Sequence, residues 1–449
     1  MARLFGTDGV RGEANTKLPP ELAYRMGRAA TIFFGRHSEG TPQILIGRDT
    51  RISGEMLEAA LVAGICSAGG NAILAGVVPT PAVAYLARKL HAAAGIVISA
   101  SHNPFGDNGI KFFGGNGYKL PDSVEDEIEQ IVRDIDAGKN FERPVGADVG
   151  RIERRKNLLE DYISFVTGTT SERFDDMKIV LDCANGAASK AMPTVLENLG
   201  AELILIGDEP DGVNINDNCG STHLDGLRSA VVKHGADIGI AHDGDADRCL
   251  CIDERGDIID GDHIMIICAK LMLEVNALPD KTVVTTVMSN IGFRQALEEL
   301  GLTCEVTAVG DRYVLENMLA NGHRLGGEQS GHIIFSDYST TGDGLITALQ
   351  VLTAMKKFRA KAGELNALMT TYPQVLLNVR VRNKDACQNS AAVKLAITEG
   401  EEELGNTGRI LVRASGTEPL IRVMAEGSDK NRLIHICNKI AAEIEKCDA

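Results

Sequence analysis

The sequence predicts a multidomain α/β protein on three observations. At 449 residues the chain is longer than one hydrophobic core usually organises. A strand–loop–helix–glycine–strand pattern occurs three times along it. The last part instead alternates apolar and polar residues, which is typical of half-exposed antiparallel strands. We therefore expect three similar α/β domains followed by a smaller C-terminal α+β domain.

The repeated pattern is clearest in its first copy. A strand at Gln43–Gly47 leads through a polar loop to a helix at Glu55–Ser67, and a second strand follows at Ala72–Ala75. The same order begins again at Lys178 and at Thr282. The helices expected in those copies are 191–199 and 293–300. A glycine follows each helix, where a left-handed residue would end it. A single long doubly wound sheet is the alternative to three related domains.

The fourth domain begins at about residue 371. Alternation predicts strands at Val375–Val381, Arg409–Val412 and Leu420–Ala425, and helical patterns lie at Ser390–Leu404 and Asp429–Lys446. Polar stretches indicate the linkers at Asp136–Arg155, Arg255–Asp260 and Thr371–Pro373. The expected domains are residues 1–155, 156–255, 256–370 and 371–449.

Composition narrows the class of function. The 62 acidic and 46 basic side chains give a net charge of −16, which argues against nucleic acid as the main partner because phosphate backbones are bound by basic surfaces. The sequence has no apolar run that could cross a membrane and no basic-then-apolar leader, so we expect a cytoplasmic protein without membrane contact. The ten cysteines include no CxxC pair, and we expect free thiols, with Cys249 and Cys251 buried in a strand.

A short apolar segment at Gly95–Ser99 predicts a buried strand that ends on a polar turn containing Ser101. Pro104 ends regular structure, and Asn103 favours a turn. Ligand groups in α/β proteins gather at the carboxyl ends of such strands, so Ser101 is a candidate for chemistry. From spacing alone, a polar turn that merely ends a strand is the alternative.

Three aspartates, Asp243, Asp245 and Asp247, follow the strand expected at 237–241 with a spacing of two residues. In a turning backbone alternate carboxylates converge, which suits a hard divalent cation, and Mg²⁺ accepts a few carboxylates and completes its shell with phosphate or water oxygen. An EF-hand is excluded because its sixth position is Arg248 rather than glycine, although Glu254 stands at the twelfth. A solvated acidic turn is the remaining alternative.

Two polar loops offer substrate contacts. One, flanked by glycines, carries Glu328, Gln329 and Ser330, whose carboxylate and hydroxyl suit sugar hydroxyls. The other lies between two C-terminal strands and offers guanidinium, hydroxyl and backbone donors that suit a phosphate. Its candidate residues are Arg413, Ser415, Gly416, Thr417 and Arg422.

Four further side chains are candidates for catalysis. Lys111 and His332 are candidates for proton transfer, and Arg11 and Arg248 for charge stabilisation. Taken alone, a single lysine is more often a surface charge and a single histidine more often structural.

Five motifs resemble those of the phosphohexomutase family. They are FGTDGVRG at 5–12, ISASHNP with DNGIKF at 98–112, DGDADR at 243–248, GGEQSGH at 326–332 and RASGTEPLIRV at 413–423. They stand in the order of the family and span nearly the whole chain. The resemblance implies mixed sheets in a four-domain, heart-shaped arrangement around a central cleft, with one motif from each domain at the active site.

The resemblance also implies roles for these residues. Ser101 would carry the phosphoryl group being exchanged and would be a fourth protein ligand of one Mg²⁺ per subunit. The loop of Glu328 would recognise the sugar, and the loop from Arg413 to Arg422 would hold the phosphate that is not reacting. The match favours Lys111 as a proton-transfer residue and leaves His332 open.

Within the family the motifs are most like those of bacterial enzymes that act on glucosamine phosphates, and Gln329 favours that sugar. The expected reaction interconverts glucosamine 6-phosphate and glucosamine 1-phosphate through phosphorylated Ser101 and a glucosamine 1,6-bisphosphate intermediate. It would feed amino-sugar nucleotide and cell-wall precursor synthesis. The expected partner is a small phosphosugar, and the expected assembly is a monomer or homodimer.

Three alternatives remain open. The first is the same chemistry on glucose or mannose phosphate. The second is an aspartyl-phosphate phosphatase, because an aspartate pair follows an apolar strand, although Ala246 stands where that signature has Thr or Val. The third is a sugar-phosphate sensor without catalytic activity.

Overall fold

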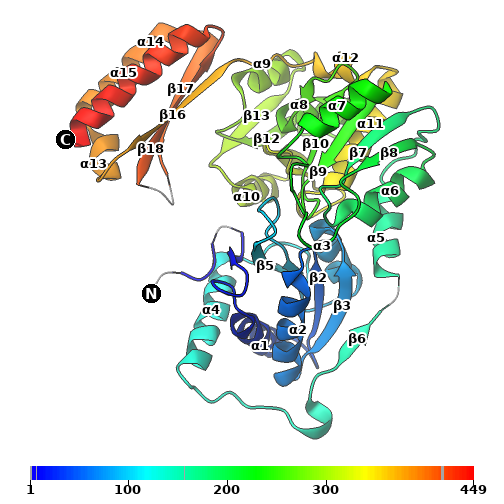
Figure 1. The fold of residues 1–449 in the computed structure, drawn as a ribbon. Helices are drawn as coiled ribbons and strands as arrows, with labels where there is room; N and C mark the ends of the chain where they lie inside the picture. The colour runs from blue at the N-terminus through cyan, green and yellow to red at the C-terminus, as the bar shows by residue number, and fades with distance from the viewer. Residues whose placement is uncertain (1–2, 7, 156, 416–418, 449) are drawn as a thin grey trace. The chain divides into compact units, whose positions relative to one another are not determined.

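The computed structural model describes residues 3–6, 8–155, 157–415 and 419–448, and the chain forms two compact units (Figure 1). The first unit comprises Met1–Met288 with Leu302–Leu368. The second comprises Ser289–Gly301 with Met369–Ala449. The first unit holds three sheets and the second unit holds one, so the expected four-domain α/β architecture with mixed sheets is confirmed.

The first sheet has the strand order β1-β5-β4-β2-β3-β6. Its strands are β1 (Val10–Glu13), β2 (Gln43–Arg48), β3 (Asn71–Val77), β4 (Ala94–Ile98), β5 (Asp107–Gly114) and β6 (Ile152–Arg154). Its helices are α1 (Pro20–Arg36), α2 (Ser53–Ser67), α3 (Thr80–Lys89) and α4 (Asp122–Asp136). Strands β2, β3, β4 and β6 run parallel, whereas β5 and β1 are antiparallel to their neighbours.

Side-chain alternation along β2 and β4 explains how helices cover both faces of this sheet. Ile44 and Ile96 belong to the core that includes residues of α1 and α2. Gly47 on β2 and Gly95 on β4 point to the other face, toward α3. A Cβ added to Gly47 would lie 2.5 Å from the Val83 side chain, and one added to Gly95 would lie 2.8 Å from it. Glycine at these two positions therefore lets α3 pack close against the sheet.

The second sheet has the order β11-β10-β9-β7-β8 and the third the order β13-β12-β14-β15. The second contains β7 (Lys178–Asp182), β8 (Glu202–Ile206), β9 (Ile238–His242), β10 (Cys249–Asp253) and β11 (Ile258–Ile259), with helices α5 (Leu158–Thr167), α6 (Ala188–Asn198) and α7 (Asp225–His234). The third contains β12 (Thr282–Thr286), β13 (Thr303–Thr307), β14 (Leu325–Gly327) and β15 (Ile333–Phe335). Helices α8 (Gly261–Glu274), α10 (Asp311–Asn321), α11 (Gly344–Phe358) and α12 (Ala362–Asn366) belong to the same unit.

The glycines predicted to end the repeated helices have the expected conformation. Gly69, Gly200 and Gly301 have φ angles of +87°, +91° and +69°. These values lie in the left-handed region that glycine enters without steric cost.

The second unit contains an antiparallel sheet of order β16-β18-β17. Its elements are β16 (Gln374–Arg380), α13 (Lys384–Asn389), α14 (Ala391–Leu404), β17 (Gly408–Ala414), β18 (Leu420–Gly427) and α15 (Lys430–Asp448). Helix α9 (Ile291–Glu299) joins this unit, where the Asn290 side chain donates to the carbonyl of Tyr372 over 3.0 Å. The α+β prediction for this part of the chain is confirmed.

Two of the predicted linkers are not wholly irregular. Within Asp136–Arg155 the last residues form β6, which pairs in parallel with β3. Within Arg255–Asp260 the chain makes a turn held by Asp253, whose carboxylate accepts from the amides of Arg255 and Asp257, and then forms β11. These strands, of three and two residues, are too short to show alternation. Thr371–Pro373 carries no helix or strand, as predicted.

All ten cysteines are free thiols, as predicted, and Cys249 and Cys251 are buried in β10. Over the described ranges, no helix combines the length and the apolar character that crossing a membrane requires.

Candidate active site

The acidic triplet occupies the tight turn between β9 and β10. Asp243, Asp245 and Asp247 are buried, and one carboxylate oxygen from each lies within 4.8 Å of the other two. Ala246 has φ of +58°, which bends the chain so that alternate side chains converge. The predicted convergence of the three carboxylates is therefore present.

The charges of the triplet favour a cation. Burial, followed by the nearby charges of Asp247 and Asp245, raises the pKa of Asp243 to about 7. Burial acts in the same sense on Asp247, but His332, Lys111 and Arg248 outweigh it and hold the pKa of that carboxyl well below its usual range. Within the described part of the chain, Oδ1 of Asp245 and Oδ1 of Asp247 are buried without a hydrogen-bond partner. Buried carboxylate oxygens without donors fit a hard divalent cation such as Mg²⁺.

Ser101 lies against this triplet at the turn that follows β4. Its Oγ donates to Oδ2 of Asp243 over 2.6 Å, and its side chain is buried. The backbone of Ser101 has φ of +52°, a left-handed conformation that a non-glycine residue adopts at a cost of about 1–3 kcal/mol. A Cβ on Gly244 would lie 2.6 Å from the Ser101 carbonyl oxygen, so the turn that contains Ser101 (the serine turn) touches the turn of the acidic triplet through its backbone.

Lys111, on β5, completes the inner part of the site. Its Nζ lies 2.8 Å from Oδ2 of Asp245 and 3.1 Å from Oδ2 of Asp8. Burial alone would lower the pKa of Lys111, but Asp245 and Asp8 raise it above its ordinary value, so the amine stays charged. Oδ2 of Asp245 also accepts from Oγ1 of Thr80 over 2.6 Å. Sequence reasoning did not identify Asp8 or Thr80.

The two candidate arginines approach the triplet from different segments. Arg11, on β1, pairs with Asp8. The backbone amide of Arg248 donates to Oδ1 of Asp243 over 3.3 Å. The side-chain Nε of Arg248 lies 4.0 Å from Oδ1 of Asp247. Burial would lower the pKa of Arg248, but the three aspartates raise it above its ordinary value. Both guanidinium groups thus lie within the charge network of the site.

His332 is buried beside the triplet and belongs to a wider ionic network. Its Nδ1 lies 3.6 Å from Oδ2 of Asp247, and its Nε2 lies 3.3 Å from Oδ2 of Asp311 and accepts from the Gly342 amide. Burial would lower the pKa of His332, but Asp311 and Asp247 raise it. Lys119 links Asp311 to Asp8 with distances of 2.6 and 2.7 Å. Lys119 and Asp311 carried no sequence signal, because each looks like an ordinary surface charge.

The loop between β14 and β15 carries Glu328, Gln329 and Ser330. Oε1 of Glu328 accepts from the Gly310 amide over 3.1 Å. Nε2 of Gln329 donates to Oδ2 of Asp260 over 3.1 Å, which leaves its Oε1 to face a donor. The Oγ of Ser330 is buried without a hydrogen-bond partner among the residues that the structure describes. This loop contacts β10, the strand that follows the acidic triplet, since the Cys249 amide donates to the carbonyl of Gly331 over 3.0 Å.

The predicted phosphate loop belongs to the second unit. Arg413 on β17 and Arg422 on β18 stand opposite each other in the antiparallel register. Burial and the neighbouring charge of Arg422 lower the pKa of Arg413, as expected where two guanidinium groups are held together. The carbonyl of Ser415 accepts from Nζ of Lys384 over 2.6 Å. Gly416 and Thr417 lie outside the described residues.

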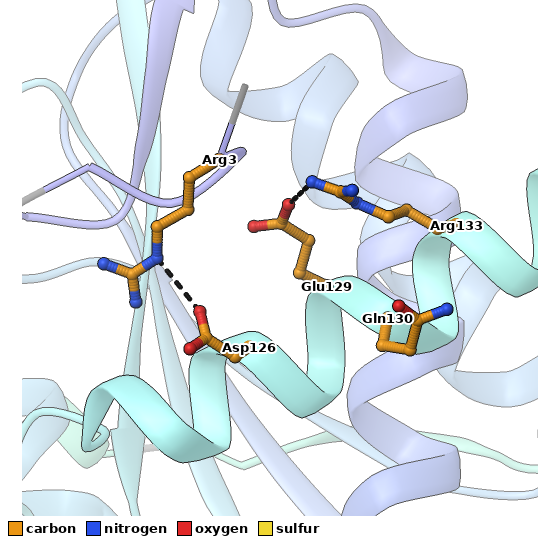
Figure 2. Close-up of a pocket in the computed structure, with 5 residues that line it drawn as sticks. All are labelled: Arg3, Asp126, Glu129, Gln130 and Arg133. Carbon is orange, nitrogen blue, oxygen red and sulfur yellow. Dashed lines mark hydrogen bonds and ion pairs between the residues drawn. The ribbon is translucent and has the colours of Figure 1, made fainter. Parts of the chain in front are cut away.

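A separate hollow of about 250 Å³ is lined by Arg3 and by residues of α4, and it contains none of the candidate residues. Figure 2 shows Arg3 pointing toward Asp126, and Glu129 paired with Arg133. These charged groups face one another rather than converging on a space for a ligand.

The chain matches four parts of one protein family along almost its whole length. The family is described as phosphoglucomutase/phosphomannomutase. Its α/β/α domain I matches residues 2–139, domain II residues 160–256, domain III residues 260–372 and the C-terminal domain residues 376–443.

Individual proteins that this chain resembles are mutases that act on phosphosugars, as their names state. A phosphoglucosamine mutase of Brevibacillus brevis is 52% identical over 448 residues, which covers 99% of this chain and 99% of the relative. A phosphoglucosamine mutase of Desulforamulus reducens is 54% identical and covers 98% and 99% of the two chains. The solved structure of Aspergillus fumigatus N-acetylphosphoglucosamine mutase, in complex with GlcNAc-6P and magnesium, has a similar fold. Its TM-score is 0.72 at 16% identity, with 99% of this chain and 96% of that chain covered.

Proposed function

The chain belongs to the phosphoglucomutase/phosphomannomutase family of phosphohexomutases, and on that premise we propose that it interconverts glucosamine 6-phosphate and glucosamine 1-phosphate. The observation that carries the proposal is the contact between Ser101 and the acidic triplet. A buried hydroxyl that donates to Asp243 over 2.6 Å, beside two carboxylate oxygens without donors, suits a serine that carries a phosphoryl group next to a cation.

The choice of sugar rests on the relatives and on the loop of Gln329. Full-length relatives named phosphoglucosamine mutase share 52% and 54% of their residues with this chain. Asp260 holds the amide of Gln329 by its nitrogen, so the amide oxygen is free to accept from an ammonium or hydroxyl group. Glucose or mannose phosphate as the preferred substrate would keep the same chemistry and is the alternative that the experiment below separates.

In the proposed reaction, phosphorylated Ser101 transfers its phosphoryl group to the free hydroxyl of the bound sugar. A bond forms between that hydroxyl oxygen and phosphorus, the bond from phosphorus to the Ser101 oxygen breaks, and the product is glucosamine 1,6-bisphosphate. The bisphosphate turns over within the site, and its other phosphate returns to Ser101 by the reverse step. The same residues therefore serve both halves of the reaction.

Charge neutralisation is the main task of the surrounding residues. Asp243, Asp245, Asp247 and an oxygen of phosphorylated Ser101 would hold one Mg²⁺, which would withdraw charge from the serine oxygen as it leaves. The charged Lys111 ammonium, buried beside Asp245, stabilises the same developing charge. His332 is the candidate whose ordinary pKa lies nearest neutrality, and we assign proton exchange with the sugar hydroxyl to it.

The remaining roles follow from side-chain chemistry. We assign recognition of the sugar hydroxyls to Glu328 and Ser330. We assign binding of the phosphate that is not reacting to Arg413, Ser415 and Arg422, together with Gly416 and Thr417. Such an enzyme would supply amino-sugar nucleotide and cell-wall precursors in the cytoplasm.

An aspartyl-phosphate phosphatase is disfavoured by the same geometry. The Asp243 carboxylate accepts from Ser101 and converges with two other aspartates, an arrangement that suits a metal ligand better than a free nucleophile.

The experiment is a comparison of substrates with purified protein, Mg²⁺ and a trace of the matching 1,6-bisphosphate. We expect kcat/KM to be higher for glucosamine 6-phosphate than for glucose 6-phosphate or mannose 6-phosphate. Equal or better efficiency with mannose phosphate would overturn the glucosamine assignment. Inorganic phosphate as the product would support a phosphatase, and unchanged substrate would support a sensor.

A further inference from the structure

The turn after β2 contains two charged side chains that are completely buried. Asp49 and Arg51 are both fully inaccessible, and Arg51 is among the largest buried side chains in the described chain. They lie 2.9 Å apart as an ion pair between Oδ2 and Nε. Burying a charged pair is costly unless the remaining donors and acceptors are also satisfied, so the contacts of this pair need an explanation.

The guanidinium group of Arg51 donates hydrogen bonds to backbone carbonyls of the serine turn. Its Nη2 donates to the carbonyls of Ser101 and Asn103 over 2.9 and 2.7 Å, and its Nη1 donates to the carbonyl of Pro104. One guanidinium plane thus fixes three carbonyls within four consecutive residues. A lysine could not reproduce this pattern, because its ammonium is a compact point charge rather than a planar fork.

Asp49 holds the same turn from its amide side. Its Oδ2 accepts from Oγ of Ser99 over 2.6 Å, and that Oγ in turn accepts from the amide of Ser101 over 2.9 Å. The Asp49–Arg51 pair therefore fixes both the N–H and the C=O of Ser101. The left-handed φ of Ser101 persists only where its surroundings over-determine it, and these bonds supply that constraint.

Two loops that follow strands of the second sheet bond to the serine turn and to Thr50. Nδ2 of Asn216 donates to the carbonyls of Ser101 and Asn103 over 2.9 and 3.1 Å. Thr50, between the two charged residues, donates its hydroxyl to the carbonyl of Asn185 over 2.6 Å. The serine turn is thus bonded to the loop that follows β8, and Thr50 to the loop that follows β7, in the sheet whose β9 leads into the acidic triplet.

We propose that Arg51, oriented by Asp49, is a positioning residue for phosphoryl transfer: it holds the serine turn so that Ser101 Oγ is directed at Asp243. The proposal rests on the proposed function, in which Ser101 carries the phosphoryl group. Arg51 touches neither the triplet nor a reacting atom, and it acts through the Ser101 backbone. Misplacement of a reacting group by about 1 Å can cost about 10²-fold in rate.

The test compares Arg51→Lys with the matched variant Arg28→Lys. Arg28 is also buried and also donates to carbonyls, those of Ser67 and Phe141, but it lies away from the serine turn. Each protein is charged with radiolabelled phosphate at Ser101. Transfer to glucosamine 6-phosphate is then followed by rapid quench and expressed per labelled site.

We expect Arg51→Lys to slow transfer per labelled site by about 10²-fold with little change in KM. We expect Arg28→Lys to lower Tm without slowing transfer. If Arg51→Lys does not fold, the transfer rate is measured instead in Ser99→Ala, a smaller change that removes the acceptor for the Ser101 amide. We expect it to slow transfer by about tenfold, since it removes one of the bonds that hold the turn.

Three outcomes would contradict these expectations in different ways. Transfer at the wild-type rate in Arg51→Lys, or in Ser99→Ala if Arg51→Lys does not fold, would overturn the positioning role and leave the proposed function standing. An equal loss in Arg28→Lys would show that general destabilisation explains the effect. Failure to label Ser101 in the wild-type protein would overturn the proposed function itself.

Discussion

Magnesium binding to the acidic triplet should be coupled to the release of a proton, and Asp243 is the group that controls this coupling. In the metal-free protein, burial and the charges of Asp247 and Asp245 raise the pKa of Asp243 to about 7. A metal ligand must be deprotonated, so binding below that value displaces a proton. Asp247 does not contribute in this range, because its pKa is held well below that of an ordinary aspartate.

The size of the effect follows from this pKa. Below about pH 7, each pH unit should weaken Mg²⁺ binding about tenfold, so the affinity at about pH 5.5 should be about 30-fold lower than at about pH 8.5. The sign for folding is consistent with this. A carboxyl whose pKa is higher in the folded than in the unfolded protein stabilises the fold less as the pH rises from about 4 to about 7. The difference amounts to about 4 kcal/mol, which a bound cation would offset.

The assay is calorimetric titration with Mg²⁺ alone, in buffers of different ionisation enthalpy. Asp243→Asn should bind Mg²⁺ more weakly at high pH and should release no proton. Asp182→Asn is the matched control, since Asp182 is a buried carboxyl whose pKa burial raises to about 6, but its oxygens accept from the amides of Ala184 and Gly220 rather than facing the triplet. An affinity that does not change between about pH 5.5 and 8.5, or a proton release that survives in Asp243→Asn, would show that Asp243 does not couple Mg²⁺ binding to the proton.

Three further predictions concern the chemistry and the substrate. Ser101→Ala should lose several orders of magnitude in kcat, and the wild-type phosphoenzyme should resist hydroxylamine as a phosphoserine does; label recovered on Asp243 would contradict this. Lys111→Met should lower kcat by about 10²–10³-fold without moving the pH optimum, because its raised pKa keeps the ammonium charged throughout; a pH–rate profile checks this. Glu328→Gln should reduce kcat/KM for every sugar, whereas Gln329→Met should mainly narrow the preference for glucosamine phosphate, and substrate panels for both variants distinguish the two effects.

The parts of the site that sequence reasoning could find are those that are local in the chain. The triplet is contained in five residues, so its convergence needs only one turn. Ser101 could be found because a buried strand ends directly before it. The helix-ending glycines could likewise be predicted, since each follows its own helix.

The parts that could not be found depend on contacts between distant segments. Asp8, Lys119 and Asp311 form one network from three distant segments. Asp8 lies within the motif at 5–12, but its pairing with Lys119 depends on a distant segment, and Lys119 and Asp311 look like ordinary surface charges. Arg51 looks equally ordinary in sequence, although the fold buries it completely. Strands β6 and β11 were missed because they are short, and their pairing depends on β3 and β10 rather than on their own pattern.

The role of Ser101 as the phosphoryl carrier is tested most directly by a chase of the labelled phosphoenzyme. Protein labelled at Ser101 with radioactive phosphate is mixed with unlabelled glucosamine 6-phosphate and Mg²⁺, and the fate of the label is followed in a rapid-quench experiment. We expect label to leave Ser101 at least as fast as the steady-state turnover and to appear in glucosamine 1,6-bisphosphate and then in glucosamine 1-phosphate. Label that remains on Ser101 during turnover, or that leaves only as inorganic phosphate, would contradict this role.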